Sequence, residues 1–170
     1  MAAVSEVHHV CLSVRNLQAS LRFYADGLGL RPTLRMDVGQ EGTWEMLRLP
    51  RGTMGRSVFL QGPSKIGQVE LVEWDLPVPA ASRPKEPGDP GILLLSFAVE
   101  QDEIAELHER LGSMGVEIHA PPRTRVLDNY GPISIFVCRD PDGNMVEILS
   151  LPSDEVVRAF RAARSSADGE

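Results

Sequence analysis

The sequence predicts an α+β fold in which two paired βαβββ modules form a cup-shaped mixed β-sheet with helices on its outer face. Three observations support this fold. The same order of patterns, a strand, a helix and then about three strands, occurs in both halves of the chain. Residues 57–70 (SVFLQGPSKIGQVE) resemble residues 134–147 (SIFVCRDPDGNMVE), and glutamate follows serine by 13 positions in both. Five prolines within residues 75–91 exclude a central strand or helix there, so this segment is predicted to link the halves.

The first half begins with a strand predicted over residues 7–14. Asn16 follows as a candidate N-cap. Apolar side chains then recur at helical spacing, and the glycines of GLGL end the helix: Leu17, Leu21, Tyr24 and Leu28. Residues 57–70 read as a β-hairpin with a turn that contains proline and glycine. The first module is therefore assigned to residues 1–74.

The second half repeats this order. A strand is predicted over residues 92–99 and a helix over residues 104–111. Residues 134–147 form a second hairpin, in which DPDGN is a turn because proline fixes φ and glycine tolerates positive φ. This module spans residues 92–152, and residues 153–170 are assigned to a final helix, capped by Ser153, and a frayed tail.

Composition narrows the class of protein. The 170 residues carry a net charge of −7 without a cluster of Lys and Arg, which argues against a nucleic-acid partner. Two cysteines form no disulfide framework, and no apolar run approaches the roughly 18 residues that span a membrane. The first residues also lack the features of a signal peptide. These observations predict a cytoplasmic protein without a membrane partner.

Alternation along the strands selects residues for the concave face of the sheet. Neighbouring side chains of a strand point to opposite faces. The aliphatic side chains of the first strand share the face that packs under the helix: Val10, Leu12 and Val14. The cup side should therefore carry His9, Cys11 and Ser13.

Glu70 and Glu147 occupy matching places in the two hairpins, and each has an apolar residue on both sides. A buried carboxylate is costly without a partner, and a metal ion is one such partner. A solvated glutamate and an incidental histidine are the alternatives at each position.

The segments HHVCLSVRNLQASLRFYADGLGL and FVCRDPDGNMVEIL resemble the vicinal oxygen chelate superfamily, and the resemblance covers about residues 4–151. This superfamily includes glyoxalase I, methylmalonyl-CoA epimerase, extradiol dioxygenases, fosfomycin resistance enzymes and bleomycin-binding proteins. The resemblance implies two paired βαβββ modules, a small-molecule substrate or ligand, and a homodimer. It also implies that His9, Glu70 and Glu147 are metal ligands.

One position departs from the superfamily's pattern. The second-module histidine of the superfamily should fall near Leu94, with Ser96 two residues later, and no histidine lies between His9 and His108. Extradiol dioxygenases require two histidines and one glutamate for iron, so their activity is the least favoured. A metal-dependent isomerase, epimerase or lyase is favoured, and a metal-free drug-binding or resistance protein is the alternative.

The resemblance also implies a cofactor and a catalytic base. The cofactor would be a divalent ion, Mg²⁺, Mn²⁺, Co²⁺, Ni²⁺, Zn²⁺ or Fe²⁺, and either Glu70 or Glu147 would act as the catalytic base. Four further residues are expected to contact the substrate, three from strand alternation and Tyr130 from its place before the second hairpin: Ser13, Leu94, Ser96 and Tyr130. A tyrosine that packs within the turn is the alternative at Tyr130. Arg123 and Arg125 read equally well as contacts to an anionic substrate and as exposed arginines of an edge strand.

Overall fold

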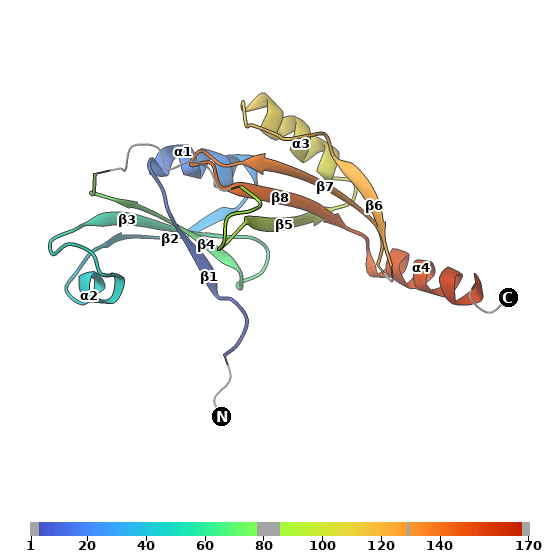
Figure 1. Ribbon diagram of the computed structural model, residues 1–170, viewed down its shortest axis with the longest axis horizontal. Coiled ribbons are helices and arrows are strands. Elements are labelled where there is room, and N and C mark those ends of the chain that lie inside the picture. The colour runs from blue at the N-terminus through green and yellow to red at the C-terminus, as the bar shows by residue number, and fades with distance from the viewer. Residues whose placement is uncertain (1–3, 78–85, 129, 168–170) are drawn as a thin grey trace. The chain divides into compact units, whose positions relative to one another are not determined.

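Each half of the chain folds into a four-stranded mixed β-sheet with a helix packed on one face, which confirms the predicted α+β class and the two βαβββ modules (Figure 1). The computed structural model describes residues 4–77, 86–128 and 130–167. The chain divides into two units, Met1–Arg83 and Pro84–Glu170. Their boundary falls within residues 75–91, the predicted linker, of which residues 78–85 lie outside the described residues, as do residues 168–170 of the predicted tail.

The first unit has its strands in the order β1-β4-β3-β2, with β1 parallel to β4 and the other pairs antiparallel. Its elements are β1 (His9–Ser13), α1 (Leu17–Leu21), the π-helical turn η1 (Arg22–Gly27), β2 (Arg31–Val38), α2 (Thr43–Leu47), β3 (Gly55–Gln61) and β4 (Gln68–Trp74). The short helix α2 was not predicted from the sequence. It lies beyond the ends of β2 and β3, away from α1 (Figure 1).

The second unit repeats the arrangement in the order β5-β8-β7-β6. Its elements are β5 (Leu94–Glu100), α3 (Ile104–Ser113), β6 (Arg123–Leu127), β7 (Gly131–Arg139), β8 (Met145–Leu151) and α4 (Asp154–Ala167). The predicted cap of the last helix is present, since the Val156 N–H donates to Ser153 Oγ at 3.4 Å. Among the described residues, no helix combines the length and apolar character needed to cross a bilayer.

The two faces of each sheet differ, and we call the face that carries α1 or α3 the outer face and the opposite one the open face. On the outer face of the first unit, the Leu17 N–H at the start of α1 donates to Glu73 Oε2 of β4 at 3.0 Å. On the outer face of the second unit, the His108 ring of α3 packs edge-on against Phe136 of β7, 5.3 Å between centroids. The cores lie under these helices and include Leu60, Leu71, Leu111, Val146 and Ile148.

The helical segment after Asn16 begins as predicted, because the Asn16 side chain accepts from the Ala19 N–H at 2.9 Å. It then widens into the π-helical turn η1. In the structure the Phe23 and Tyr24 rings are both buried and meet edge to face at 4.9 Å.

The two hairpins pair in different registers, which corrects the equivalence drawn from their sequences. In the first, Glu70 lies opposite Phe59, so Ser57 shares the open face with Glu70. In the second, Glu147 lies opposite Val137, and Ser134 lies opposite Ser150. Ser134 therefore points to the outer face, where its N–H donates to Ser150 Oγ at 2.9 Å. The spacing of 13 residues is the same, but the serines face opposite sides.

Candidate functional site

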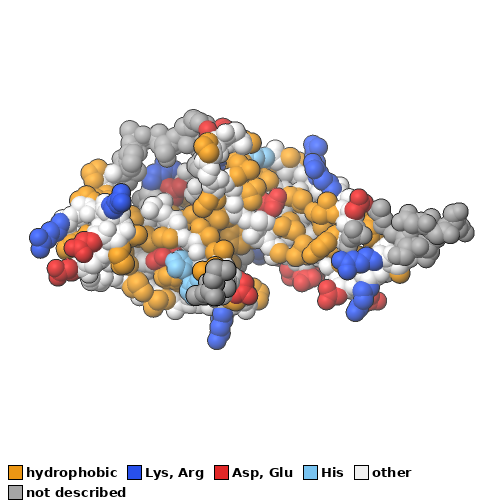
Figure 2. Space-filling model, turned by 60° about the horizontal axis from the view of Figure 1, so that its bottom comes forward, with side chains coloured by type: hydrophobic (Ala, Val, Ile, Leu, Met, Phe, Trp, Pro, Cys, Tyr) orange, Lys and Arg blue, Asp and Glu red, His pale blue; other side chains and the backbone are white. Residues whose placement is uncertain are grey.

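The open face of the first unit carries the predicted residues of β1. His9, Cys11 and Ser13 are exposed, whereas Val10 and Leu12 are partly covered on the other face. Parallel pairing places Cys11 beside Glu70 of β4. Histidine side chains, drawn in pale blue, are visible at the molecular surface in Figure 2. The alternation along the first strand thus identifies its open face correctly.

The Glu70 carboxylate contacts three other side chains of this face: Ser57, His9 and Cys11. Its Oε1 accepts a hydrogen bond from Ser57 Oγ at 2.6 Å, and its Oε2 lies 3.6 Å from His9 Nε2. The Glu70 side chain is 14% exposed and that of His9 is 38% exposed. The carboxylate is thus held by the protein on one side while its other oxygen faces an accessible imidazole.

His8 contributes to the orientation of His9. Both Nδ1 atoms lie 2.9 Å apart, so one ring donates a hydrogen bond to the other. The rings meet at 87°, and the His9 ring also packs edge-on against Phe59 of β3. With Nδ1 engaged by His8, the second nitrogen of His9 is directed toward Glu70. His8 precedes β1, so the alternation that governs the strand does not fix its direction.

Cys11 is a neutral thiol in this setting. Although the residue as a whole is exposed, partial burial of its sulfur is the largest cause, followed by the charge of Glu70 and a hydrogen bond to that carboxylate, and together they raise the pKa of Cys11 to about 12. Burial and the charge of Asp140 likewise raise the pKa of Cys138 to about 12. Because only the thiolate is a nucleophile, neither thiol should be reactive near neutral pH.

We therefore expect the native protein to react with Ellman's reagent at pH 8 about 100-fold more slowly than free cysteine, whose pKa is about 8.5, or slower still. Two thiols should react in denaturant. Glu70→Gln should accelerate modification of Cys11, measured in a Cys138→Ala background, since it removes a negative charge that opposes the thiolate. Rapid modification of the native protein would contradict the assignment.

The open face of the second unit carries Glu147, and Ser96 Oγ donates to its Oε2 at 2.7 Å. Leu94 pairs with Met145, two positions before Glu147, so the place matching His9 is apolar. Tyr130 is exposed in the turn between β6 and β7. It precedes Val137, the partner of Glu147, by seven residues, or roughly 23 Å of extended strand.

The structure thus brings His9 and Glu70 together within the first unit and Ser96 and Glu147 together within the second. The convergence of Glu147 with His9 and Glu70 stays a prediction, as do the substrate contacts of Ser13, Leu94, Ser96 and Tyr130. Within the described residues, no three or more His, Cys, Asp or Glu side chains gather in a group that could hold a metal ion.

Sequence reasoning missed Ser57 and His8 as partners of this site. Ser57 is 1% exposed and could have been identified only by its register with Glu70. The sequence also does not indicate that the Trp74 indole N–H donates to Ser13 Oγ, at 3.3 Å. No pattern in the sequence signals these contacts, because those of Ser57 and Trp74 depend on cross-strand pairing and His8 precedes β1, outside its alternation.

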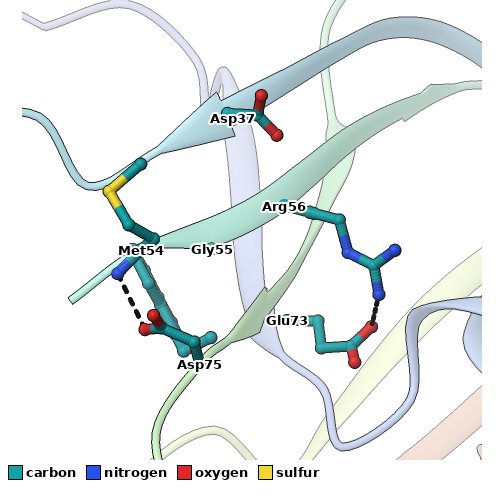
Figure 3. Close-up of a pocket in the computed structure, with 7 residues that line it drawn as sticks. Asp37, Met54, Gly55, Arg56, Glu73 and Asp75 are labelled. Atoms are coloured by element: carbon teal, nitrogen blue, oxygen red, sulfur yellow. Dashed lines mark hydrogen bonds and ion pairs between the residues drawn. The ribbon is translucent and has the colours of Figure 1, made fainter.

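A cavity of about 250 Å³ lies elsewhere in the first unit, where β2 ends, β3 begins and β4 ends (Figure 3). The Met54 N–H donates to Asp75 Oδ1 at 2.7 Å, and Arg56 Nη2 donates to Glu73 Oε2 at 3.0 Å. Several polar groups that line the cavity are therefore hydrogen-bonded to one another. None of the predicted site residues lines it.

Comparison with known proteins places this geometry in context. A sequence model described as the Glyoxalase/Bleomycin resistance protein/Dioxygenase superfamily matches residues 6–148. A curated relative, the lactoylglutathione lyase-like protein terB of Aspergillus terreus, is 26% identical over 151 residues, which cover 86% of this chain and 75% of the relative.

Solved structures share the fold. A glyoxalase family protein from Bacillus cereus is 19% identical, with a TM-score of 0.73 over 89% of this chain and 97% of its own. A glyoxylase/bleomycin resistance protein/dioxygenase domain from Frankia sp. is 25% identical, with a TM-score of 0.60 over 89% of this chain and 96% of its own. A glyoxalase family protein from Enterococcus faecalis is 26% identical, with a TM-score of 0.56 over 85% of this chain and 96% of its own.

Proposed function

Because the chain belongs to the Glyoxalase/Bleomycin resistance protein/Dioxygenase superfamily, we propose that it is a divalent-metal-dependent isomerase, epimerase or lyase acting on a small oxygenated metabolite. The observation that supports this function is the pairing of His9 Nε2 with Glu70 Oε2 at 3.6 Å on an accessible sheet face. The proposal includes a homodimer in the cytoplasm, as the resemblance implies.

The donor atoms of this pair fit one metal ion. Two ligands that each lie about 2.1 Å from an ion are at most about 4.2 Å apart, and the observed 3.6 Å is within this limit. The ring nitrogen of a metal-binding histidine that does not bind the ion usually forms a hydrogen bond. The Nδ1 of His9 forms such a bond with His8 Nδ1. Imidazole and carboxylate ligands suit Mn²⁺, Fe²⁺, Co²⁺, Ni²⁺ and Zn²⁺, and Mg²⁺ with water as additional ligand. Glu147 is proposed as the third protein ligand.

The two glutamates have different surroundings, which suggests different roles. Ser57 and Cys11 both donate to the Glu70 carboxylate, whereas the contact described for Glu147 comes from Ser96. Both glutamates would hold the ion, and we assign to Glu147 the additional role of leaving it to remove a proton next to a substrate carbonyl. The bound ion would supply a Lewis acid for the substrate's neighbouring oxygens.

A metal-free binding protein for a small hydrophobic compound is the second candidate function. The observation that favours it is Leu94, which pairs with Met145 and leaves the second unit without an imidazole beside Glu147. Exposed apolar side chains on the open face of β2, Leu34 and Met36, would suit such a ligand. A ring-cleaving dioxygenase is the weakest candidate, because its iron needs the histidine that Leu94 replaces.

Elemental analysis of protein purified without chelator tests the first function against the second. We expect about one divalent ion per chain, and removal of the ion with EDTA should lower the thermal midpoint, because a ligand bound only to the native state stabilises it. Readdition of the ion should restore the midpoint. A full-length preparation that holds no ion, and gains no stability from any of the six ions, would contradict the proposal and favour the metal-free function.

A further inference from the structure

The edge strand β6 carries two arginines whose direction is fixed by pairing. Thr124, between them, hydrogen-bonds Ser134 at 2.8 Å, and Ser134 is buried on the outer face of the second unit. Arg123 and Arg125 therefore point to the open face, opposite Ile135 and Ile133. This is the face on which Glu147 lies.

These arginines are available to a ligand. Every residue of β6 is exposed, and neither guanidinium pairs with an acid among the described residues. Arg139 on the same face is different, because it lies 3.4 Å from Glu86 and 3.6 Å from Glu117 and donates to the Gly143 carbonyl. Two unpaired guanidinium groups on one face are notable in a chain with a net charge of −7.

Inward-pointing charges are also one of the devices by which an edge strand avoids pairing with another chain. Strand β2, the matching edge of the first unit, carries one arginine on the open face, since Arg31 lies opposite Gln61, and another, Arg35, on the outer face. Strand β6 differs from β2 because its two arginines lie two residues apart on the open face, while Val126 on the outer face is 63% exposed.

The distances suit one bound anion that is part of a larger molecule. Arg123 and Arg125 are two residues apart on one strand, so their Cα atoms are roughly 7 Å apart and both forks can reach one carboxylate or phosphate. Arg123 is separated from Glu147 by two strand spacings and two residues, roughly 12 Å between Cα atoms. The apolar side chains of Ile135 and Val137 lie between them on the same face. Near Arg125, Phe160 of α4 packs against Gly131 and borders this end of the sheet.

We propose that Arg123 and Arg125 form a subsite for an anionic group, a carboxylate or a phosphate, on the small molecule that the open face of the second unit binds. The substrate class is then an acidic metabolite with a short apolar stretch between its anionic group and the part that meets Glu147. The part of this proposal that places the substrate against Glu147 rests on the proposed function, whereas the anion subsite itself does not.

Titration of the full-length protein tests the subsite. The probes are adipate, its neutral counterpart adipamide and inorganic phosphate, in a buffer with EDTA and no other polyvalent anion, followed by NMR of the arginine Nε–H groups. We expect saturable binding of adipate or phosphate and none of adipamide. Arg123→Gln and Arg125→Gln should each weaken the binding at least tenfold, because each removes a charge-assisted hydrogen bond. The anion that binds with the higher affinity, adipate or phosphate, identifies the preferred group as carboxylate or phosphate.

The matched control is Arg35→Gln, an exposed arginine on the outer face of the equivalent strand, which should change the affinity less than twofold. Arg125→Lys should lose part of the affinity, since it keeps the charge but not the fork. Equal weakening by Arg35→Gln, equal binding of adipamide, or no saturable binding of either anion would overturn the subsite. If the protein binds adipate in this titration but holds no divalent ion in the elemental analysis, the proposed function is overturned and the anion subsite stands.

Discussion

Replacing His9 by alanine, or Glu70 by glutamine, is expected to weaken binding of Co²⁺ to the full-length chain by about 100-fold or more. Each change removes a proposed direct ligand, and loss of a partner outside the ligand set alone costs roughly 10–100-fold. Titration of the visible absorption of Co²⁺ measures the affinity of each variant directly. His9 and Glu70 face each other at 3.6 Å, so the two single variants should be nearly as weak as the double variant.

Two further variants make this result specific. Ser57→Ala should weaken Co²⁺ binding by about tenfold, because the hydroxyl that holds Glu70 Oε1 is lost while both ligands remain. Glu45→Gln, an exposed position in α2, should have no effect. An unchanged affinity in the His9 and Glu70 variants would remove the proposed ion site.

The same titration tests whether the second unit contributes. Glu147→Gln should weaken Co²⁺ binding as strongly as Glu70→Gln if both carboxylates bind the same ion. An affinity unchanged by Glu147→Gln, with loss in the His9 variant, would restrict the ion to the first unit.

Gly39→Ala is expected to destabilise the protein by roughly 3 kcal/mol or more, through strain at φ +111° and a collision that the backbone must absorb. A Cβ at Gly39 would lie 2.1 Å from the Thr53 carbonyl oxygen and 2.9 Å from Met54 Cα. The Thr53 oxygen cannot easily move, because it accepts the Trp44 indole N–H at 2.7 Å. The thermal midpoint should fall by about 6–12 °C for a chain of this size.

Gly29→Ala is the matched control. Gly29 also has a positive φ, +79°, but nothing lies within 4 Å of a Cβ placed there. It should therefore cost only the left-handed conformation, about 1–2 kcal/mol. Equal midpoints for the two variants would show that the contact between Gly39 and Thr53 carries no strain.

The features that sequence reasoning identified depend on period and turn chemistry. Alternation in the first strand separates His9 from Val10 without ambiguity, since a strand repeats every two residues. The DPDGN turn is also local: Asp140 accepts from the Asn144 N–H at 2.8 Å and from the Asp142 N–H at 3.0 Å. Such patterns predict the two modules, their helices and the open-face position of His9 and Glu70.

The features it missed depend on contacts between strands or on short segments. Helix α2 has five residues, too few to show a helical period, and Trp44 anchors its loop through a hydrogen bond to Thr53. The turn η1 looks like a continued α-helix in the sequence, because Leu17, Leu21 and Tyr24 fit that period too. Ser57 owes its place beside Glu70 to strand pairing, which no local pattern encodes.

The registers of the two hairpins also bear on how the internal duplication should be aligned. Six residues join β3 to β4, whereas five join β7 to β8, so a correct superposition of the halves needs a one-residue gap at the turn. With that gap, the counterpart of Ser57 is Ile135. An alignment without the gap assigns every side chain of β7 to the wrong face of the sheet. Grafting the Ser57 hydroxyl onto the second half would accordingly require a change at Ile135, with Ser134 left in place.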